Sequence, residues 1–199
     1  MIKKLAFFIL FCGSVSAQEQ CNIEKSKEYQ QELNKEYSDN KTTPLTAADL
    51  KDFTNLDFFK ANSDYCVVAK IKRTINAKPF VMQTTTDRSP MYVKYADLVF
   101  LIDGKEQILE VYQSIKPASI DAFSTDLFLP FTDLTTGKES YGGGRYMDLE
   151  IPDGDLITLD FNRAYNPYCA YNARYSCPLV PKVNHLEVEI RAGVKKFHD

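Results

Sequence analysis

The stretch that decides the fold is residues 91–114, "MYVKYADLVFLIDGKEQILEVYQS". Two runs that are rich in β-branched and aromatic residues stand on either side of Asp103-Gly104. This dipeptide is a strong signal for a two-residue hairpin turn, because Asp and Gly tolerate the positive φ that such a turn requires. The stretch therefore predicts two long antiparallel strands joined by a tight turn.

The same pattern recurs on both sides of this hairpin. Asp153-Gly154 predicts a second hairpin, between residues 145–151 and 156–161. At residues 186–192, buried-type residues alternate with charged ones, which is typical of an antiparallel sheet with one buried face. The segments that predict further strands are "YCVVAKIKRT", "PFVMQTTT", "LFLPF", "RYMDLEI", "LITLDF" and "LEVEIRA". We find no alternation of strands with helices, so we expect a mainly β fold, a single antiparallel sandwich or partly closed barrel with a short helical N-terminal lead-in.

The N-terminal region predicts an export signal followed by helices. Residues 1–17 combine two lysines, a short apolar run and small residues before Ala17, which is the pattern of a signal peptide. Residues 23–38 carry a narrow stripe through Ile23, Ser26, Tyr29 or Gln30, Leu33 and Tyr37, so we expect a surface helix. Thr46 precedes Asp49 by three residues, as in a capping box that opens a short helix. The expected organisation is a signal peptide at 1–17, a helical lead-in at 18–48 and one β-rich domain at 49–199.

The composition narrows the function classes. The formal net charge is −3 and no basic cluster is present, which argues against nucleic acid as a partner. No later segment reaches the roughly 20 apolar residues that a membrane-spanning helix needs. We expect an exported protein, periplasmic or secreted, that uses no cofactor, and the sequence leaves its oligomeric state open.

Four cysteines follow the predicted cleavage site: Cys21, Cys66, Cys169 and Cys177. An even number in an exported chain favours disulfides, and four cysteines allow three pairings. Pairing Cys169 with Cys177 would close a short loop, and pairing Cys21 with Cys66 would tie the N-terminal segment to a strand. Free buried thiols are the alternative. Cys169, Cys177 and His185 are spaced by eight, unlike the close pairs of structural zinc sites, so we expect no metal.

Polar residues gather in two regions, "FTDLTTGKESYGGGRY" at 131–146 and "DFNRAYNPYCAYNARYSCP" at 160–178. They flank the predicted hairpin at 145–161, so we expect them to meet at one edge of the sheet. Arg145 follows three glycines and offers a bidentate clamp for an anionic group. The alternative is a structural pair of Arg145 with Asp133 or Asp160. The candidate ligand-binding residues are Asp133, Tyr141, Arg145, Asp160, Asn162, Arg163 and Asn166.

The second region also has a binding and a structural interpretation. Its asparagines and tyrosines, among them Tyr165, Tyr168 and Tyr175, offer the stacking faces and directional hydrogen bonds of a sugar- or peptide-binding groove. The same side chains can instead satisfy the backbone of a long irregular loop.

Three motifs resemble the bacterial and archaeal domain of unknown function 1684 family. They stand here as Asp133-Leu134-Thr135-Thr136-Gly137, as Tyr141-Gly142-Gly143-Gly144-Arg145-Tyr146 and as the block from Asp160 to Ala170. The resemblance covers roughly residues 50–194 and implies no established activity.

These observations leave three functions open. The first is binding of a small polar or anionic ligand at the edge formed by the 133–146 and 160–178 loops. The second is a cell-envelope hydrolase that uses Asp133 and Asp160 as acid and base, as paired carboxylates do in glycoside hydrolysis. The third is a structural envelope protein without a ligand. A serine or cysteine hydrolase is disfavoured, because such enzymes need a histidine base and the chain offers only His185 and His198.

Overall fold

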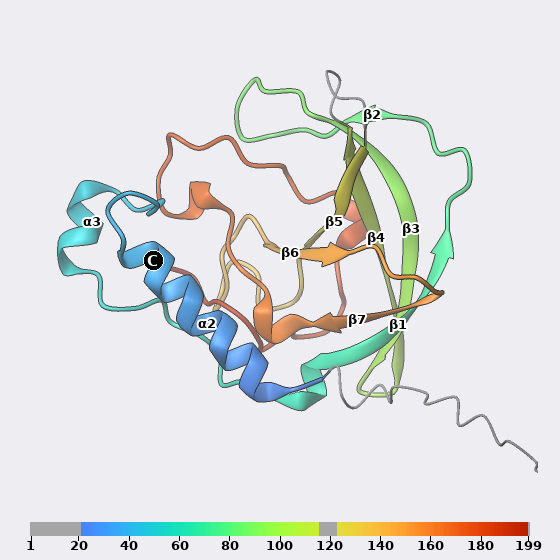
Figure 1. Ribbon diagram of the computed structural model, residues 1–199, viewed down its shortest axis with the longest axis horizontal. Coiled ribbons are helices and arrows are strands. Elements are labelled where there is room, and N and C mark those ends of the chain that lie inside the picture. Colours follow the sequence, from blue (N-terminus) through green and yellow to red (C-terminus); the bar gives the residue numbers. More distant parts are fainter. Residues whose placement is uncertain (1–20, 116–122, 199) are drawn as a thin grey trace, which may run out of the picture.

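The structure is a computed structural model that describes residues 21–115 and 123–198 (Figure 1). The predicted signal peptide at 1–17 lies outside the described residues. The sheet has seven strands: β1 (Cys66–Arg73), β2 (Phe80–Val81), β3 (Met91–Ile102), β4 (Lys105–Ile115), β5 (Phe123–Phe131), β6 (Arg145–Glu150) and β7 (Leu156–Asp160). Within residues 21–65, the helices α2 (Ile23–Ser38) and α3 (Ala47–Asp52) precede it. The described residues also form the short 3-10 turns η1 (Ser63–Tyr65), η2 (Phe161–Arg163), η3 (Tyr168–Ala170) and η4 (Lys182–Asn184).

The strands form a half-barrel in the order β6-β5-β4-β3-β1-β7, with every neighbouring pair antiparallel and β2 paired to β3. The predicted mainly β class is confirmed. The hairpin at Asp103-Gly104 is confirmed as well, since Ile102 lies opposite Lys105 and both turn residues have positive φ (50° and 71°). This hairpin supplies the two longest strands of the sheet.

The predicted hairpin at Asp153-Gly154 is wrong. β6 pairs with β5 and β7 pairs with β1, so these two consecutive strands lie at opposite ends of the sheet order. In Figure 1 they run in opposite directions across the open side of the half-barrel. A five-residue connection, 151–155, replaces the expected two-residue turn. Asp153-Gly154 lies where the chain reverses direction, but the strands on either side do not pair with each other: β6 pairs with β5, and β7 pairs with β1.

The open side is bridged at one point beyond the strands. The backbone N–H of Tyr146 donates to the carbonyl oxygen of Tyr165 at 2.9 Å, and the N–H of Tyr165 donates back at 3.0 Å. The chain after β7 therefore meets the start of β6. The expected meeting of the two polar loops is real, although the hairpin from which it was inferred is not.

Residues 186–192 form no strand, contrary to the prediction. Leu186, Val188 and Ile190 are buried and the charged residues between them are exposed, so the alternation was read correctly. The segment instead crosses the half-barrel as an extended chain and bonds to the 132–134 segment, through Leu186 N–H to Thr132 and Leu134 N–H to Val188. Period-two burial needs an extended backbone with one buried face, and a regular ladder is only one way to provide it.

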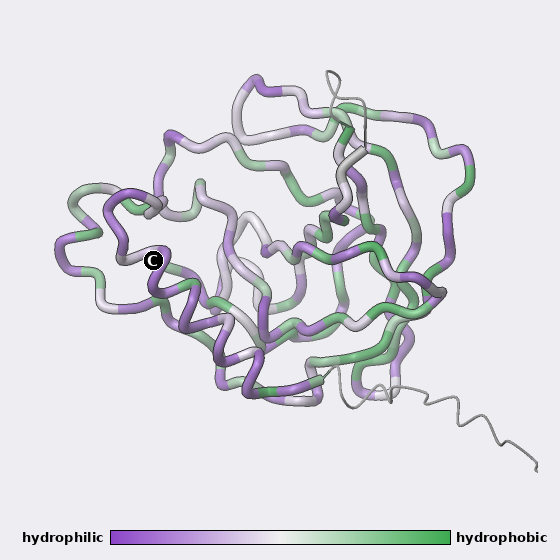
Figure 2. The backbone as a smooth tube through the Cα atoms, viewed as in Figure 1, coloured by the Kyte–Doolittle hydropathy of each residue, from purple (hydrophilic) through white to green (hydrophobic). Residues whose placement is uncertain are grey.

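The core fills the concave side of the sheet. It joins leucines of β3, β4, β5 and β7 to the extended C-terminal segment, with Leu98, Leu109, Leu129 and Leu159 wholly buried. Figure 2 shows long hydrophobic stretches along the strands, whereas α2 is mostly hydrophilic.

Helix α2 packs on a second, smaller cluster that includes Leu33, Tyr37, Tyr171 and Val194. Asn22 caps α2 at its N-terminus, and Thr46 caps α3 by accepting from the Asp49 N–H at 3.1 Å, as the capping box predicted. A disulfide between Cys21 and Cys66 ties the start of α2 to β1, which confirms one predicted pair. The packing of α2 on the smaller cluster and the disulfide together hold this helix beside the open edge of the half-barrel.

Candidate functional site

Arg145 begins β6 and is wholly buried. The preceding Gly144 has φ +86°, and a Cβ there would lie 2.6 Å from the carbonyl oxygen of Phe131, so only glycine allows this tight entry. The guanidinium donates to the carbonyl oxygens of Ile190 (2.8 Å) and Ala192 and to Oδ1 of Asp133 (3.1 Å). Burial lowers the pKa of Arg145 and the charge of Asp133 opposes that shift. Arg145 thus anchors the C-terminal segment and does not face a ligand.

Asp133, the partner of Arg145 in this ion pair, is also buried. Its Oδ2 accepts from the Ile190 N–H at 2.7 Å and from the Thr135 N–H at 3.2 Å, and the hydroxyl of Thr136 donates to Oδ1 at 3.1 Å. The buried ion pair with Arg145 measures 3.1 Å. The carboxylate is therefore saturated by donors of the chain itself, which is the structural alternative weighed for it.

Asp160 and Asn162 dock α2 onto the sheet. Asp160 accepts from the Ser26 hydroxyl at 2.6 Å and from the N–H and side-chain amide of Asn162 at 3.1 and 2.8 Å. The Asn162 side chain is buried and also exchanges two hydrogen bonds of 2.9 Å with the backbone of Asn62. Gln30 of α2 donates to the Asn162 carbonyl oxygen at 2.9 Å.

The remaining predicted site residues are dispersed. Asn166 is buried and donates to the Lys195 carbonyl oxygen at 2.8 Å. Arg163 is exposed and lies over the ring of Tyr29, 4.7 Å from its centre. The hydroxyl of Tyr141 is 3.9 Å from the sulfur of Cys169. The seven predicted residues therefore do not converge on one site; Asp160 and Arg163 line a cavity of about 260 Å³ beside Tyr29 and Asp148.

Cys169 and Cys177 are free thiols, which differs from the disulfide predicted for them. They lie in contact, since the N–H of Cys169 donates to the sulfur of Cys177 at 3.1 Å. The hydrogen bond from the Cys177 thiol lowers the pKa of Cys169 to about 6, with burial acting the other way. The same bond and burial raise the pKa of Cys177. The eight-residue loop brings the sulfurs together as inferred, but as a thiol pair.

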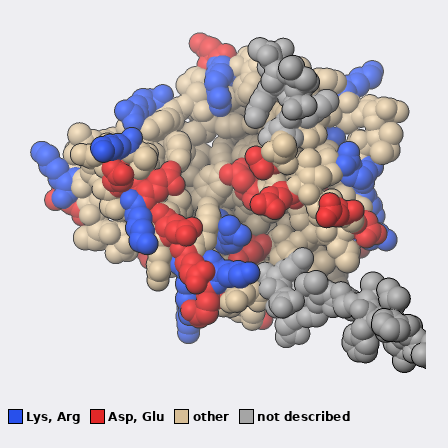
Figure 3. All heavy atoms as spheres, viewed as in Figure 1, with Lys and Arg blue, Asp and Glu red and all other residues tan. Residues whose placement is uncertain are grey.

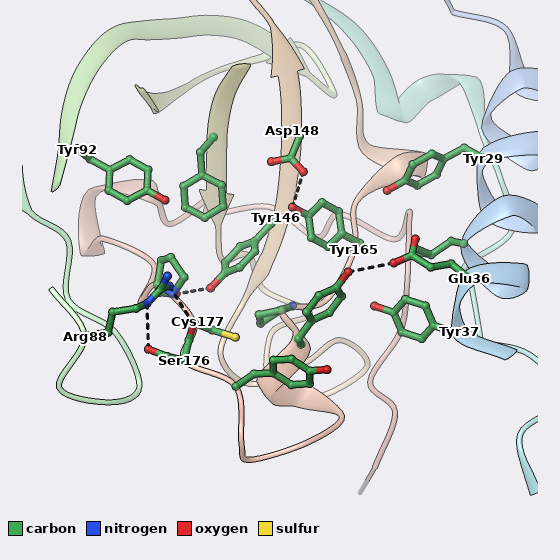
Figure 4. Close-up of a pocket in the computed structure, with 16 residues that line it drawn as sticks. Tyr29, Glu36, Tyr37, Arg88, Tyr92, Tyr146, Asp148, Tyr165, Ser176 and Cys177 are labelled. Carbon is green, nitrogen blue, oxygen red and sulfur yellow. Dashed lines mark hydrogen bonds between the residues drawn. The ribbon is translucent and has the colours of Figure 1, made fainter. Parts of the chain in front are cut away.

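A cleft of about 400 Å³ lies between α2, the open edge of the half-barrel and the 165–178 loop (Figure 4). Seven of the chain's 12 tyrosines line it, so its walls are far more aromatic than the chain as a whole. Helix α2 contributes Tyr29, Leu33, Glu36 and Tyr37, the strands contribute Tyr92, Phe128, Tyr146 and Asp148, and the loops contribute Arg88, Tyr165, Pro167, Tyr168, Tyr175, Ser176, Cys177 and Pro178.

Ring contacts join these side chains into a continuous wall. Phe128 lies 4.8 Å from Tyr146 and 5.7 Å from Tyr92, and Tyr146 lies 5.9 Å from Tyr165, as distances between ring centres. Phe128 stands opposite Asp148 in the β5–β6 register, and Tyr146 shares a face with Asp148 because side chains two apart on a strand point the same way. The wall is thus set by strand register and closed by the bridge from Tyr146 to Tyr165.

Two carboxylates face this cleft, and each accepts a tyrosine hydroxyl. Tyr165 donates to Oδ2 of Asp148 at 2.7 Å, and Tyr168 donates to Oε1 of Glu36 at 3.0 Å. Burial raises the pKa of Asp148, the hydrogen bond from Tyr165 lowers it and the charge of Asp126 raises it further. Burial and the Glu36 carboxylate raise the pKa of Tyr168 to about 12. The tyrosines therefore remain neutral donors around two carboxylates.

At the other end of the cleft, Arg88 donates to the Ser176 carbonyl oxygen at 2.9 Å, and Tyr146 donates to the carbonyl oxygen of Pro178. Within residues 21–115 and 123–198, no group of three or more His, Cys, Asp or Glu side chains could hold a metal ion. In the same ranges, no helix combines the length and apolarity that crossing a membrane requires.

The sequence drew attention to the 160–178 loop beside this cleft, but none of the seven side chains that it proposed as ligand contacts lines the cleft. The tyrosines of the 160–178 loop were recognised as a possible groove lining, and three of them do line the cleft. The contributions of Tyr29, Glu36 and Asp148 were missed, because they lie on a helix and a strand whose positions relative to the loop the sequence does not state. The high tyrosine content was the one available signal for an aromatic site.

Comparison with known proteins gives a family and a structural relative. A family profile described as "Protein of unknown function (DUF1684)" matches residues 51–195. The solution NMR structure of an uncharacterized protein from Haloarcula marismortui is 35% identical, with a TM-score of 0.69 over 90% of this chain and 97% of that chain. The search of curated proteins found no match.

Proposed function

The chain belongs to the DUF1684 family of proteins of unknown function, and from that premise we propose that it binds a small polar molecule in the tyrosine-lined cleft. The observation that carries the proposal is the cleft itself, about 400 Å³ in volume and lined by aromatic rings with two carboxylates. Ligand sites commonly have this size and combine apolar walls with a few placed polar groups.

The cleft lies beside the point where the two polar loops were expected to meet, but the residues that line it differ from those predicted as ligand contacts. Asp133, Arg145, Asn162 and Asn166 are buried and bonded to the chain itself, so they support the walls. Tyr165, Tyr168 and Asp148 line the cavity and replace them as proposed ligand contacts.

The hydrolase alternative finds no support in the carboxylates that it requires. Asp133 is buried against Arg145, and both oxygens of Asp160 accept hydrogen bonds from Ser26 and Asn162. A general acid or base must reach the proton that it transfers. Binding is therefore the function that the geometry supports better.

We also propose that the protein works outside the cytoplasm. The signal-like pattern of residues 1–17 and the Cys21–Cys66 disulfide support this, since disulfides persist in oxidising compartments. Amino-terminal sequencing of the protein from its host should give Gln18 as the first residue, and a chain that keeps residues 1–17 would contradict export by this signal.

The binding proposal is tested by NMR titration of the ¹⁵N-labelled protein with three probes: maltose, choline and succinate. At least one probe should shift the amide signals of residues 146–148 and 165–168 in a saturable way. Tyr168→Ala should weaken that binding, because Tyr168 forms part of the cleft wall. Tyr141→Ala is the matched control, since Tyr141 was predicted as a ligand contact but does not line the cleft. If no probe shifts these signals at about 10 mM, the proposal is refuted. A dissociation constant of 1 mM corresponds to about 4 kcal/mol of binding free energy, so binding weaker than this concentration range would be too weak to count as specific.

A further inference from the structure

We propose that the cleft selects a small organic cation, an amine or a quaternary ammonium compound, which lies against the tyrosine rings beside Asp148 and Glu36. This inference rests on the proposed function, because it names the class of ligand for the same cleft.

The first observation is that the carboxylates of the cleft lack a basic partner. Asp148 and Glu36 each accept a hydrogen bond from a tyrosine hydroxyl. Among the described residues, no ion pair within 4.0 Å involves either carboxylate. Lys25 and Arg163 line the neighbouring cavity of about 260 Å³ together with Asp148, outside the tyrosine-lined cleft. Figure 3 shows acidic side chains on both sides of the hollow at the centre of this face. A ligand that fills the cleft displaces water from these carboxylates, and a positive charge on the ligand compensates for that loss.

The second observation is the density of aromatic faces around the carboxylates. A cation within about 6 Å of a tyrosine ring centre is attracted by the negative face of the ring, and cages of such rings recognise quaternary ammonium groups. The chain already uses this attraction at the margin of the cleft, where Arg163 lies 4.7 Å from the centre of Tyr29 and Arg174 lies 4.7 Å from that of Tyr175. Among the described residues, no such guanidinium lies over Tyr165 or Tyr168, and Tyr168 is 39% exposed, so these two rings are the ones open to a ligand.

The third observation is the position of the one basic lining residue. Arg88 lies at the end of the cleft away from Glu36, and it is bonded to Ser176 (Figure 4). An anionic ligand near the ring wall would meet two carboxylates and the negative faces of the rings. A neutral ligand would leave both carboxylates without a cation in direct contact. The cleft therefore favours a cation over either.

The test compares choline with 3,3-dimethylbutan-1-ol, its neutral isostere with carbon in place of nitrogen, and adds putrescine as a primary amine. Each is titrated into the ¹⁵N-labelled protein while the amide signals of Asp148, Tyr165 and Tyr168 are followed. We expect at least one of the two cations to bind in the cleft, and choline to bind at least tenfold more tightly than its isostere.

Two variants assign the effect. Asp148→Asn keeps an acceptor for the Tyr165 hydroxyl but removes the negative charge. It should therefore weaken cation binding at least tenfold and leave the affinity for the neutral isostere unchanged. Glu150→Gln is the matched control. It removes one negative charge from an exposed residue of β6, two positions after Asp148, that does not line the cleft, so it should leave cation binding unchanged.

The outcomes separate the two proposals. If the isostere or maltose binds in the cleft as tightly as both cations, the selection of cations is overturned and the cleft remains a binding site. If Asp148→Asn and Glu150→Gln weaken cation binding equally, the carboxylate of Asp148 is not the selective group and the inference fails. If neither the cations nor the isostere, maltose or succinate moves the cleft signals, the proposed function fails with it.

Discussion

Replacing Asp133 by asparagine should destabilise the protein far more than removing an exposed carboxylate that holds the same segment. Asp133 is the counter-charge of the wholly buried Arg145, and it also accepts the N–H of Ile190 at 2.7 Å. The amide of asparagine keeps one acceptor oxygen but turns the other into a donor, which would face donors of Arg145, Thr135 or Ile190. Arg145 would then be left as a buried charge without compensation.

The magnitude follows from burial. Breaking a buried ion pair by removing one partner costs about 3–5 kcal/mol. At 2–4 °C for each kcal/mol in a chain of this size, the melting temperature should fall by roughly 6–20 °C. The matched control is Glu139→Gln, which removes the partner of Arg191 in an ion pair of 2.7 Å whose side chains are 48% and 40% exposed. Exposed pairs contribute only about 0–1 kcal/mol.

Urea unfolding at neutral pH, followed by circular dichroism and extrapolated to water, measures both free energies of unfolding. The two ion pairs hold residues 190–192 in place, so the comparison isolates the effect of burial. A loss below about 1 kcal/mol for Asp133→Asn, or equal losses for the two variants, would refute a structural role for the Asp133–Arg145 pair and reopen a ligand role for Arg145.

Three further predictions concern the cysteines and the cleft. Reduction of the Cys21–Cys66 bond, or Cys21→Ser, should lower the free energy of unfolding by about 4 kcal/mol, because the bond spans 45 residues of sequence; equal urea midpoints with and without reductant would contradict this. Iodoacetamide at pH 7 should alkylate Cys169 before Cys177, since the pKa of Cys169 is about 6 and that of Cys177 is raised; peptide mass spectrometry measures the order, and faster labelling of Cys177 would count against the thiol pair described. Asp148→Asn should raise the free energy of unfolding at pH 7 slightly, because partial desolvation raises the pKa of Asp148 in the folded protein and so disfavours its ionised form there, while the exposure of the residue to solvent keeps the gain small. That gain should vanish below about pH 4, where the carboxyl is protonated in both states, and urea unfolding at pH 7 and pH 3.5 would expose a variant that is instead less stable at pH 7.

The last of these predictions distinguishes a functional carboxylate from a structural one. A residue kept for stability should cost stability when it is neutralised, as expected for Asp133. A residue kept for binding can cost stability while it is present, because its charge is compensated only when a ligand arrives. If Asp148→Asn gains stability and loses cation binding, both observations have the same cause.

Several features of the fold were legible in the sequence because they depend on neighbouring residues. The Asp103-Gly104 turn, the capping box at Thr46 and the helix at 23–38 are each specified within a few residues. The alternation at 186–192 likewise revealed which side chains are buried. Local backbone preference and burial period carry this information along the chain itself.

The partners of the strands could not be read in the same way. The Asp153-Gly154 signal is as clear as that of Asp103-Gly104, yet β6 and β7 pair with β5 and β1. Each of these ladders joins segments distant in sequence and is decided by which faces bury the most apolar surface together. A turn signal carries no information on that competition.

The sequence by itself determined that the chain forms an antiparallel β protein with a helical lead-in and that Cys21 and Cys66 can pair. That the two polar loops meet was expected from a hairpin that does not form, and the meeting depends on the tertiary bridge between Tyr146 and Tyr165. Only the tertiary structure decided which polar residues are buried supports and which face a cleft. Arg145 and Asp148 are both charged residues of one short strand, but one is directed into the core and the other toward the tyrosines of α2 and the 165–178 loop. The reason is physical: a side chain's role depends on the surface packed against it, and here that surface comes from segments far away in the chain.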